Sequence, residues 1–101
     1  MGLFDFLFGN KTAKIQEFKD RGAYIVDVRS ENEYKNGAIP GSKNIPLPIL
    51  SSKISEIKNW NKPIITCCAS GVRSASAAGI LKKNGIEAIN GGGWNSLGRN
   101  I

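Results

Sequence analysis

The amino-acid sequence predicts a small α/β domain in which a parallel β-sheet carries helices on both faces. Residues 24–28 and 64–67 are short, mostly apolar and rich in β-branched side chains, as strands buried on both faces are. Segments with apolar residues at helical spacing alternate with these runs, which is the order from which parallel sheets are built. A length of 101 residues leaves room for a single hydrophobic core.

The composition is that of an ordinary globular protein, with 41% apolar and 22% charged residues. The net charge is +6, but the lysines are scattered and form no basic run, so we expect no nucleic-acid partner. The chain contains no histidine, which excludes a cysteine–histidine protease and a histidine-ligated metal site. The two cysteines are adjacent and cannot link distant segments, which indicates a reducing compartment, the cytoplasm.

Residues 1–11 form a short apolar segment ahead of the domain, which we expect to span residues 12–101. The apolar stretch is too short to cross a bilayer, so no transmembrane segment is expected. Its large apolar residues fall on one face of a helical turn or two, namely Leu3, Phe4, Leu7 and Phe8. We expect this face to dock on the domain, while contact with a membrane surface or with a partner stays open.

The first part of the domain reads as helix, strand and helix. An amphipathic helix is expected at residues 12–21, closed by Gly22, and the strand at residues 24–28 follows. Ser30 and Glu33 have the spacing of a capping box, so a short helix should begin there and end before Gly37.

Three charged residues lie around the end of this strand: Asp27, Arg29 and Glu33. An aspartate in such a place can be a catalytic base. Buried charges, however, usually survive by pairing. We therefore expect these three side chains to form a structural polar network.

The middle of the chain is a loop followed by a helix. Residues 37–48 contain two glycines and three prolines, which predicts a rigid loop with a short extended piece at residues 44–46. Apolar residues at helical spacing predict a helix over residues 48–59, and we expect Trp60 to pack where it ends.

The last part of the chain again alternates helix and strand. A helix is expected from residue 74 to residue 83 with Gly85 as its cap, and then a short strand at residues 86–89. The glycines at 91–93 would let the backbone pass close to a neighbouring segment. Trp94 follows at once and either lines the mouth of a site or packs on the domain.

The chemistry concentrates at the end of the central strand, at Cys68. A thiol there faces the amino end of the next helix, where free N–H groups and the helix dipole favour negative charge. The pKa of a cysteine, ordinarily about 8.5, can fall to about 3.5–7.5 in such surroundings. We expect Cys68 to be a reactive thiolate beside an anion site, which residues 69–73 form with their amides and Arg73 with its guanidinium group.

Three blocks of the sequence resemble single-domain rhodaneses. Residues 68–74 read Cys-Ala-Ser-Gly-Val-Arg-Ser, against Cys-x-Ser-Gly-x-Arg-Ser in the family. Residues 25–29 read Ile-Val-Asp-Val-Arg with Glu-Tyr soon after, and residues 37–46 read Gly-Ala-Ile-Pro-Gly-Ser-Lys-Asn-Ile-Pro. The likeness runs from about residue 12 to residue 101. It departs from the family pattern at Ala38, usually His, at Ser42, often Ala, and at Leu97, usually Trp.

The resemblance implies a rhodanese-like fold and a sulfurtransferase activity. Cys68 would be the catalytic nucleophile that carries sulfane sulfur as a persulfide, and the loop residues Ala69, Ser70, Gly71, Val72 and Arg73 would bind the substrate. The partners implied are a small anionic donor such as thiosulfate and a thiol or other thiophilic acceptor, which another protein could supply. No metal or organic cofactor is required. The block with Asp27, Arg29 and Glu33 is mainly architectural in the family.

Two other functions stay open. Counted from Cys67, the loop has the Cys-x5-Arg spacing of cysteine phosphatases and arsenate reductases, and either thiolate could attack a tetrahedral centre. A phosphatase also needs a general acid, and the only acidic residues after position 34 are Glu56 and Glu87. The resemblance therefore favours the rhodanese, with Cys67 as a buried strand residue. A rhodanese-like sulfur-carrier, redox or partner-binding module is the remaining alternative.

Overall fold

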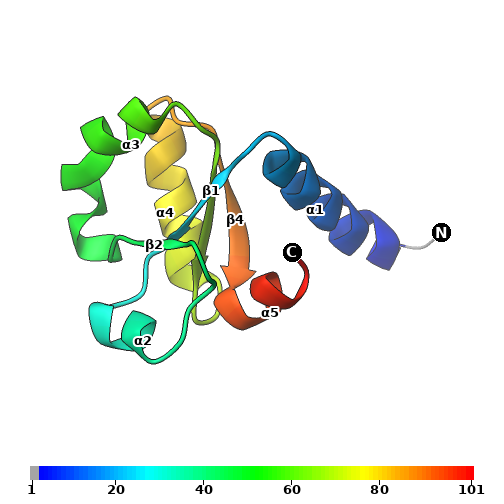
Figure 1. Ribbon diagram of the computed structural model, residues 1–101. Coiled ribbons are helices and arrows are strands. Elements are labelled where there is room, and N and C mark those ends of the chain that lie inside the picture. Colours follow the sequence, from blue (N-terminus) through cyan, green and yellow to red (C-terminus); the bar gives the residue numbers. More distant parts are fainter. Residues whose placement is uncertain (1–2) are drawn as a thin grey trace.

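The fold is built on a parallel sheet at the centre of the molecule (Figure 1). The computed structural model describes the backbone of residues 3–101 and the side chains of residues 11–101. Within that part, four strands pair in the order β2-β1-β3-β4, all parallel. Their bounds are Tyr24–Asp27 for β1, Lys43–Asn44 for β2, Ile64–Cys68 for β3 and Ala88–Gly93 for β4. The predicted α/β class with a small parallel sheet is confirmed.

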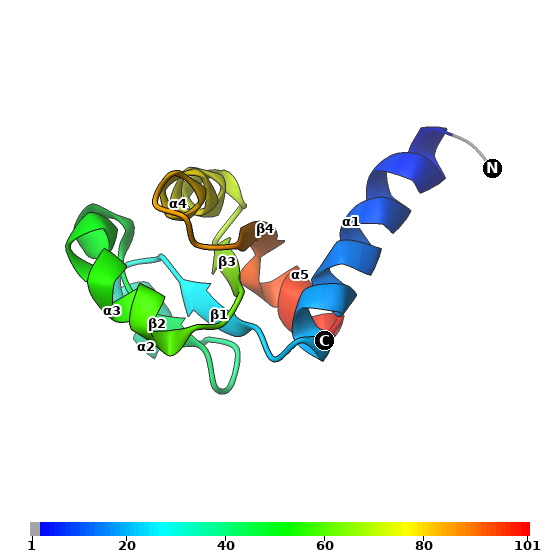
Figure 2. The ribbon, with the colours of Figure 1, turned by 90° about the horizontal axis from the view of Figure 1, so that it is seen from above.

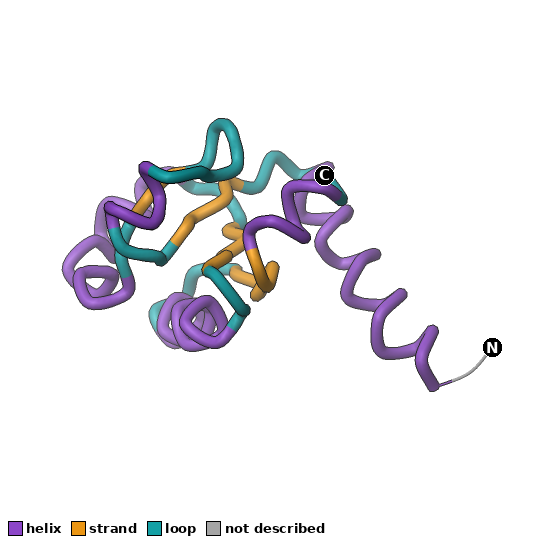
Figure 3. The backbone as a smooth tube through the Cα atoms, turned by 90° about the horizontal axis from the view of Figure 1, so that it is seen from below, coloured by secondary structure: helices purple, strands orange, loops and turns teal. Residues whose placement is uncertain are grey.

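Helices cover both faces of the sheet, as predicted (Figure 2). The 3-10 helix η1 (Leu47–Lys53), α3 (Ile54–Trp60) and α4 (Val72–Lys83) lie on one face. Helix α1 (Leu3–Asp20) and α5 (Trp94–Arg99) lie on the other. The short helix α2 (Glu31–Lys35) lies at the end of the molecule where the strands terminate, and Figure 3 looks onto that end from below.

The central strand β3 joins the two layers of the core. All five of its residues are buried, and successive side chains point to opposite faces. Ile64 and Cys68 pack with the apolar residues of η1, α3 and α4, whereas Ile65 and Cys67 pack with Phe18 of α1 and Leu97 of α5. Burying one such aliphatic side chain contributes about 1.5–3 kcal/mol. The strand that carries the candidate nucleophile is thus among the most firmly held segments of the fold.

Helix α1 is longer than expected. The sequence predicted a separate apolar segment and a helix at residues 12–21, but one continuous helix runs from Leu3 to Asp20. No proline interrupts the region, and a single glycine at position 9 lowers helix stability by only about 1 kcal/mol. The first turns point away from the sheet (Figures 1 and 2). The side chains of residues 1–10 lie outside the described part, so docking of the apolar face stays a prediction.

Other predicted boundaries shift by a few residues. The helix expected over residues 48–59 is divided into η1 and α3, and Trp60 packs against Tyr24 with ring centroids 5.4 Å apart, as predicted. Helix α4 begins at Val72, two residues before the predicted start, and β4 covers residues 88–93 where residues 86–89 were expected. Among the helices of the described residues, none is both long and apolar enough to pass through a membrane.

Candidate active site

The sharp connection between β3 and α4 forms the candidate site. We call residues 68–73 the cysteine loop. Gly71, the N-cap of α4, has a φ of 100°, a left-handed conformation that favours glycine. A Cβ at Gly71 would also lie 3.3 Å from Cα of Gly92 on β4. The glycine thus turns the chain back toward the strand end and brings loop amides over the sulfur of Cys68.

The sulfur of Cys68 is enclosed by hydrogen-bond partners from the start of α4. The Gly71 N–H donates to Sγ at 3.0 Å and the Ser74 N–H at 3.4 Å, and the Ser74 hydroxyl lies 3.3 Å away. Burial alone would raise the pKa of the Cys68 thiol, but the hydrogen bonds from Ser74 and from the loop amides outweigh it, and the pKa is lowered. The geometry favours a thiolate without any neighbouring base.

Cys67 has the opposite environment. Its side chain lies in the other layer of the core, with Ile65, Phe18 and Leu97, and has no exposed surface. Burial, together with the nearby charge of Asp27, raises the pKa of Cys67 to about 12. The expectation of a buried strand residue agrees with this position. A neutral thiol on the far face of the sheet is poorly placed to serve as the nucleophile of the Cys-x5-Arg alternative.

The predicted substrate-binding residues lie around the loop with different exposure. Ala69 and Ser70 are exposed, Gly71 is half-buried, and Val72 points into solvent with 73% of its surface exposed. Cys68 itself has no exposed surface. The loop therefore covers the sulfur in this conformation.

Arg73 is held by a partner that the sequence did not indicate. Its two terminal nitrogens donate to the two carboxylate oxygens of Glu33 at 2.8 and 3.0 Å. These hydrogen bonds, with those from Ser30, lower the pKa of Glu33 to about 2. In the expected polar network of Asp27, Arg29 and Glu33, Glu33 takes part through its backbone carbonyl, which accepts a hydrogen bond from Arg29. Its carboxylate pairs with Arg73 of the cysteine loop instead.

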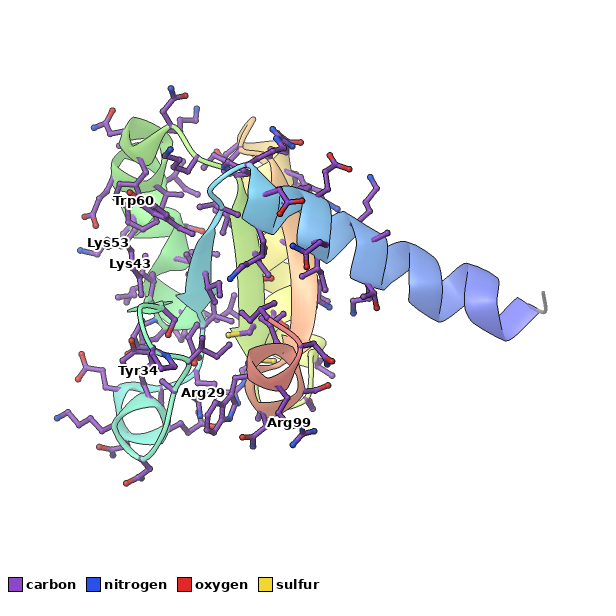
Figure 4. The ribbon with its side chains drawn as sticks, turned by 45° about the vertical axis from the view of Figure 1, so that its right-hand side comes forward. Arg29, Tyr34, Lys43, Lys53, Trp60 and Arg99 are labelled. Atoms are coloured by element: carbon purple, nitrogen blue, oxygen red, sulfur yellow. The ribbon has the colours of Figure 1, made fainter. Side chains whose placement is uncertain are left out.

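The other two members of the predicted network form a buried ion pair. The Arg29 guanidinium donates to both oxygens of Asp27 at 2.7–3.0 Å and to the carbonyl of Gly37 at 2.7 Å. Its charge lies 4.4 Å from the centre of the Trp94 ring. Figure 4 shows Arg29 between α2 and α5. Trp94 thus packs on Arg29, and the hydrogen bonds of Arg29 to the carbonyls of Glu33 and Gly37 connect α2 to the end of the sheet.

The glycines of β4 allow the close contacts predicted from their sequence. A Cβ at Gly91 would lie 2.8 Å from the carbonyl oxygen of Thr66, and a Cβ at Gly93 would lie 2.9 Å from the carbonyl oxygen of Ala69. The cysteine loop therefore rests directly on bare backbone of β4. Asn90 in this strand was not predicted as a site residue, yet its side chain hydrogen bonds to Ser74 and to the carbonyl of Gly71. A single asparagine in a short strand gives no signal of such contacts in the sequence.

Comparison with known proteins identifies the family. The model of the Rhodanese-like domain matches residues 11–98. The chain belongs to the rhodanese family. It is 42% identical over 81 residues to the uncharacterized protein YqhL of Bacillus subtilis, covering 78% of this chain and 64% of that protein. It is 35% identical over 65 residues to the thiosulfate sulfurtransferase GlpE of Pseudoalteromonas translucida, covering 64% and 61%.

A solved structure supports the same conclusion. The rhodanese-like domain protein from Staphylococcus aureus superposes with a TM-score of 0.67 at 37% identity, with 74% of each chain covered. The chain spans less than two thirds of the length of the first curated relatives that it matches. Other relatives are the putative sulfur carrier protein YrkF of Bacillus subtilis and the thiosulfate sulfurtransferase GlpE of Shewanella oneidensis, which are 39% and 30% identical to this chain.

Proposed function

We propose that this rhodanese-like domain is a sulfurtransferase that carries sulfane sulfur on Cys68. The observation that supports it most is the pair of N–H groups, from Gly71 and Ser74, that donate to the Cys68 sulfur at 3.0 and 3.4 Å, with the Ser74 hydroxyl oxygen 3.3 Å away and a lowered pKa of Cys68. Such an arrangement stabilises a thiolate nucleophile in a chain without histidine. The family and the sulfurtransferase names of its relatives point in the same direction.

The proposed reaction is a double displacement. The Cys68 thiolate attacks the outer sulfur of thiosulfate, the S–S bond of the donor breaks, and sulfite leaves with the electron pair. A second thiolate then attacks the outer sulfur of the Cys68 persulfide and restores the Cys68 thiolate. The loop amides, including those of Ser70 and Gly71, hold the negative sulfur in both states. No metal or organic cofactor takes part.

The partners follow from this chemistry. The donor is a small sulfur anion or a persulfide, and the acceptor is a small thiol or a protein thiol. Two unpaired cysteines suit a reducing compartment, so we place the activity in the cytoplasm. Arg73 would bind the donor anion, but because Glu33 holds it at 2.8 Å, the donor has to compete with that carboxylate.

The test is intact mass after incubation with thiosulfate. The protein should gain one sulfur atom, and a reducing thiol should remove it. Cys68→Ser should abolish the gain, while the matched Cys67→Ser should keep most of it. If Cys67 proves to be the essential thiol, the proposed register of the loop is wrong and a phosphatase or arsenate reductase activity becomes the better hypothesis. A folded protein that takes up no sulfur would instead favour a partner-binding module.

A further inference from the structure

The side chain of Asn90, in β4, connects three parts of the site. Its Nδ2 donates to the carbonyl oxygen of Gly71 at 3.1 Å, and its Oδ1 accepts from the Gly92 N–H at 2.9 Å. These two backbone partners fix the orientation of the amide, because a carbonyl can only accept and an N–H can only donate. Oδ1 is therefore the atom that faces the Ser74 hydroxyl, 2.7 Å away.

This orientation decides the direction of the Ser74 hydroxyl. Oδ1 of Asn90 has no proton to give, so Ser74 must donate to it. Ser74 is fully buried and has one hydroxyl proton. With that proton on Asn90, Ser74 turns lone pairs toward the Cys68 sulfur at 3.3 Å. Only a protonated thiol can complete this arrangement, by donating its own proton to Ser74.

A thiolate requires the reverse. The Ser74 proton must then turn to the sulfur, where it joins the N–H groups of Gly71 and Ser74. Asn90 Oδ1 keeps the Gly92 N–H after this rotation, so no buried acceptor is left without a partner. The two orientations of one buried hydroxyl thus correspond to the two protonation states of Cys68.

We propose that Ser74 is a two-position hydroxyl switch and that Asn90 is the positioning residue that holds its proton while Cys68 is a thiol. The proposal depends on the proposed function only where it gives the switch a role in catalysis. The orientation of the Ser74 hydroxyl is a property of the folded protein, whatever reaction the protein performs. Asn90 competes with the Cys68 sulfur for the same proton. It therefore opposes formation of the thiolate and sets how much of the nucleophile is present at a given pH.

The charged groups around the site do not supply this effect. Arg73, which interacts with the Cys68 sulfur from α4, is neutralised by Glu33 from α2. Asp27 and Arg29 at the end of β1 neutralise each other. Cys67, on the other face of β3, has a pKa near 12 and stays neutral. The hydrogen bonds of Ser74 and of the loop remain as the groups that respond to ionisation of Cys68.

The test is the alkylation rate of Cys68 against pH, in a Cys67→Ser background with one thiol. Ser74→Ala removes the hydroxyl donor of the thiolate, so the midpoint should rise by about one pH unit. Asn90→Leu removes the competing acceptor, together with the hydrogen bonds of Asn90 to the Gly71 carbonyl and the Gly92 N–H, and the midpoint should fall by about 0.5–1 unit. The loop turn survives this change because the Ala75 N–H also donates to the Gly71 carbonyl, at 3.1 Å. In the double variant Ser74→Ala/Asn90→Leu, the Asn90 substitution should no longer lower the midpoint relative to that of Ser74→Ala alone.

The sign of the Asn90 shift separates the switch from a structural role. If Asn90 only supports the loop, Asn90→Leu loosens the amides and moves the midpoint up, toward that of a free thiol. That result overturns the proposal, as does a downward shift that persists in the double variant. Asn90→Ala, which adds no volume, tests the same sign if leucine does not fit, with a smaller downward shift expected. The assay needs no sulfur transfer, so it can succeed even if the proposed function fails.

Discussion

The contact between Gly93 and the cysteine loop offers a direct test of how strictly the loop must be placed. Gly93 has φ −70° and ψ 136°, which any residue adopts, so Gly93→Ala introduces a Cβ without backbone strain. That Cβ would lie 2.9 Å from the carbonyl oxygen of Ala69, whereas ordinary contacts begin near 3.4 Å. Ala69 must therefore move by about half an ångström, and the amides that follow it must move as well.

The expected loss follows from that displacement. A misplacement of about 1 Å at a reacting centre can lower the rate about a hundredfold, so half of it should lower kcat/KM for thiosulfate about tenfold. The added methyl group should also lower the free energy of unfolding by about 1–3 kcal/mol. Steady-state kinetics and urea denaturation measure the two effects separately, at a temperature where the variant is fully folded.

Gly79→Ala is the matched control. A Cβ at Gly79, in the middle of α4, would have no heavy atom within 4 Å apart from its chain neighbours and the backbone of its own helix. This variant should gain about 0.5–1 kcal/mol of stability from the better helix propensity of alanine and keep the activity of the parent. A folded Gly93→Ala protein with kcat/KM within twofold of the parent would refute the reasoning, because the loop would then tolerate the displacement.

Three further predictions concern charges and thiols. Glu33→Gln removes the negative charge that holds Arg73 but keeps the capping box, because the glutamine amide can still accept from the Ser30 N–H. Freeing Arg73 should lower KM for thiosulfate severalfold at low salt. An unchanged KM would show that the carboxylate does not compete with the donor. Asp27→Asn should lower the free energy of unfolding by about 3–5 kcal/mol in urea denaturation, since it leaves the buried Arg29 charge uncompensated; a loss below about 1 kcal/mol would contradict this. The pKa of Cys67 is about 12 in the folded protein, whereas a cysteine in an unfolded chain has a pKa of about 8.5. The unfolded state therefore releases its proton first, and stability should fall as pH rises above about 8.5. The slope is at most about 1.4 kcal/mol per pH unit, and Cys67→Ala should lack this part of the alkaline loss in parallel denaturation curves.

Features that depend on neighbouring residues could be predicted from the sequence. The Ser30 and Glu33 capping box is present in both directions, because its groups lie within one helical turn. The buried central strand follows from its apolar, β-branched run, and the position of Cys68 at its end follows from the glycine turn behind it. These features need no information from distant parts of the chain.

The features that escaped prediction depend on residues far apart in sequence. Glu33 and Arg73 are separated by 40 positions, and nothing near either residue indicates that α2 turns toward the cysteine loop. Asn90 and Gly71 are separated by 19 positions. The role of Asn90 in the site comes from three hydrogen bonds made at the same time, and these depend on the register of its strand. A helix was expected to begin only at residue 12, after a separate apolar segment, but α1 runs through Gly9 and Asn10, residue types that usually weaken helices.

The alternation of β3 has a consequence for oxidation. Cys67 and Cys68 are neighbours in sequence, yet their sulfurs lie in different layers of the core, one beside α5 and the other beneath α4. A disulfide requires the two Cβ atoms to face each other, which this arrangement prevents. A sulfenic acid formed on Cys68 therefore has no resolving thiol in its own chain. Its reduction would depend on a thiol from another molecule, and that thiol would have to reach a sulfur that has no exposed surface.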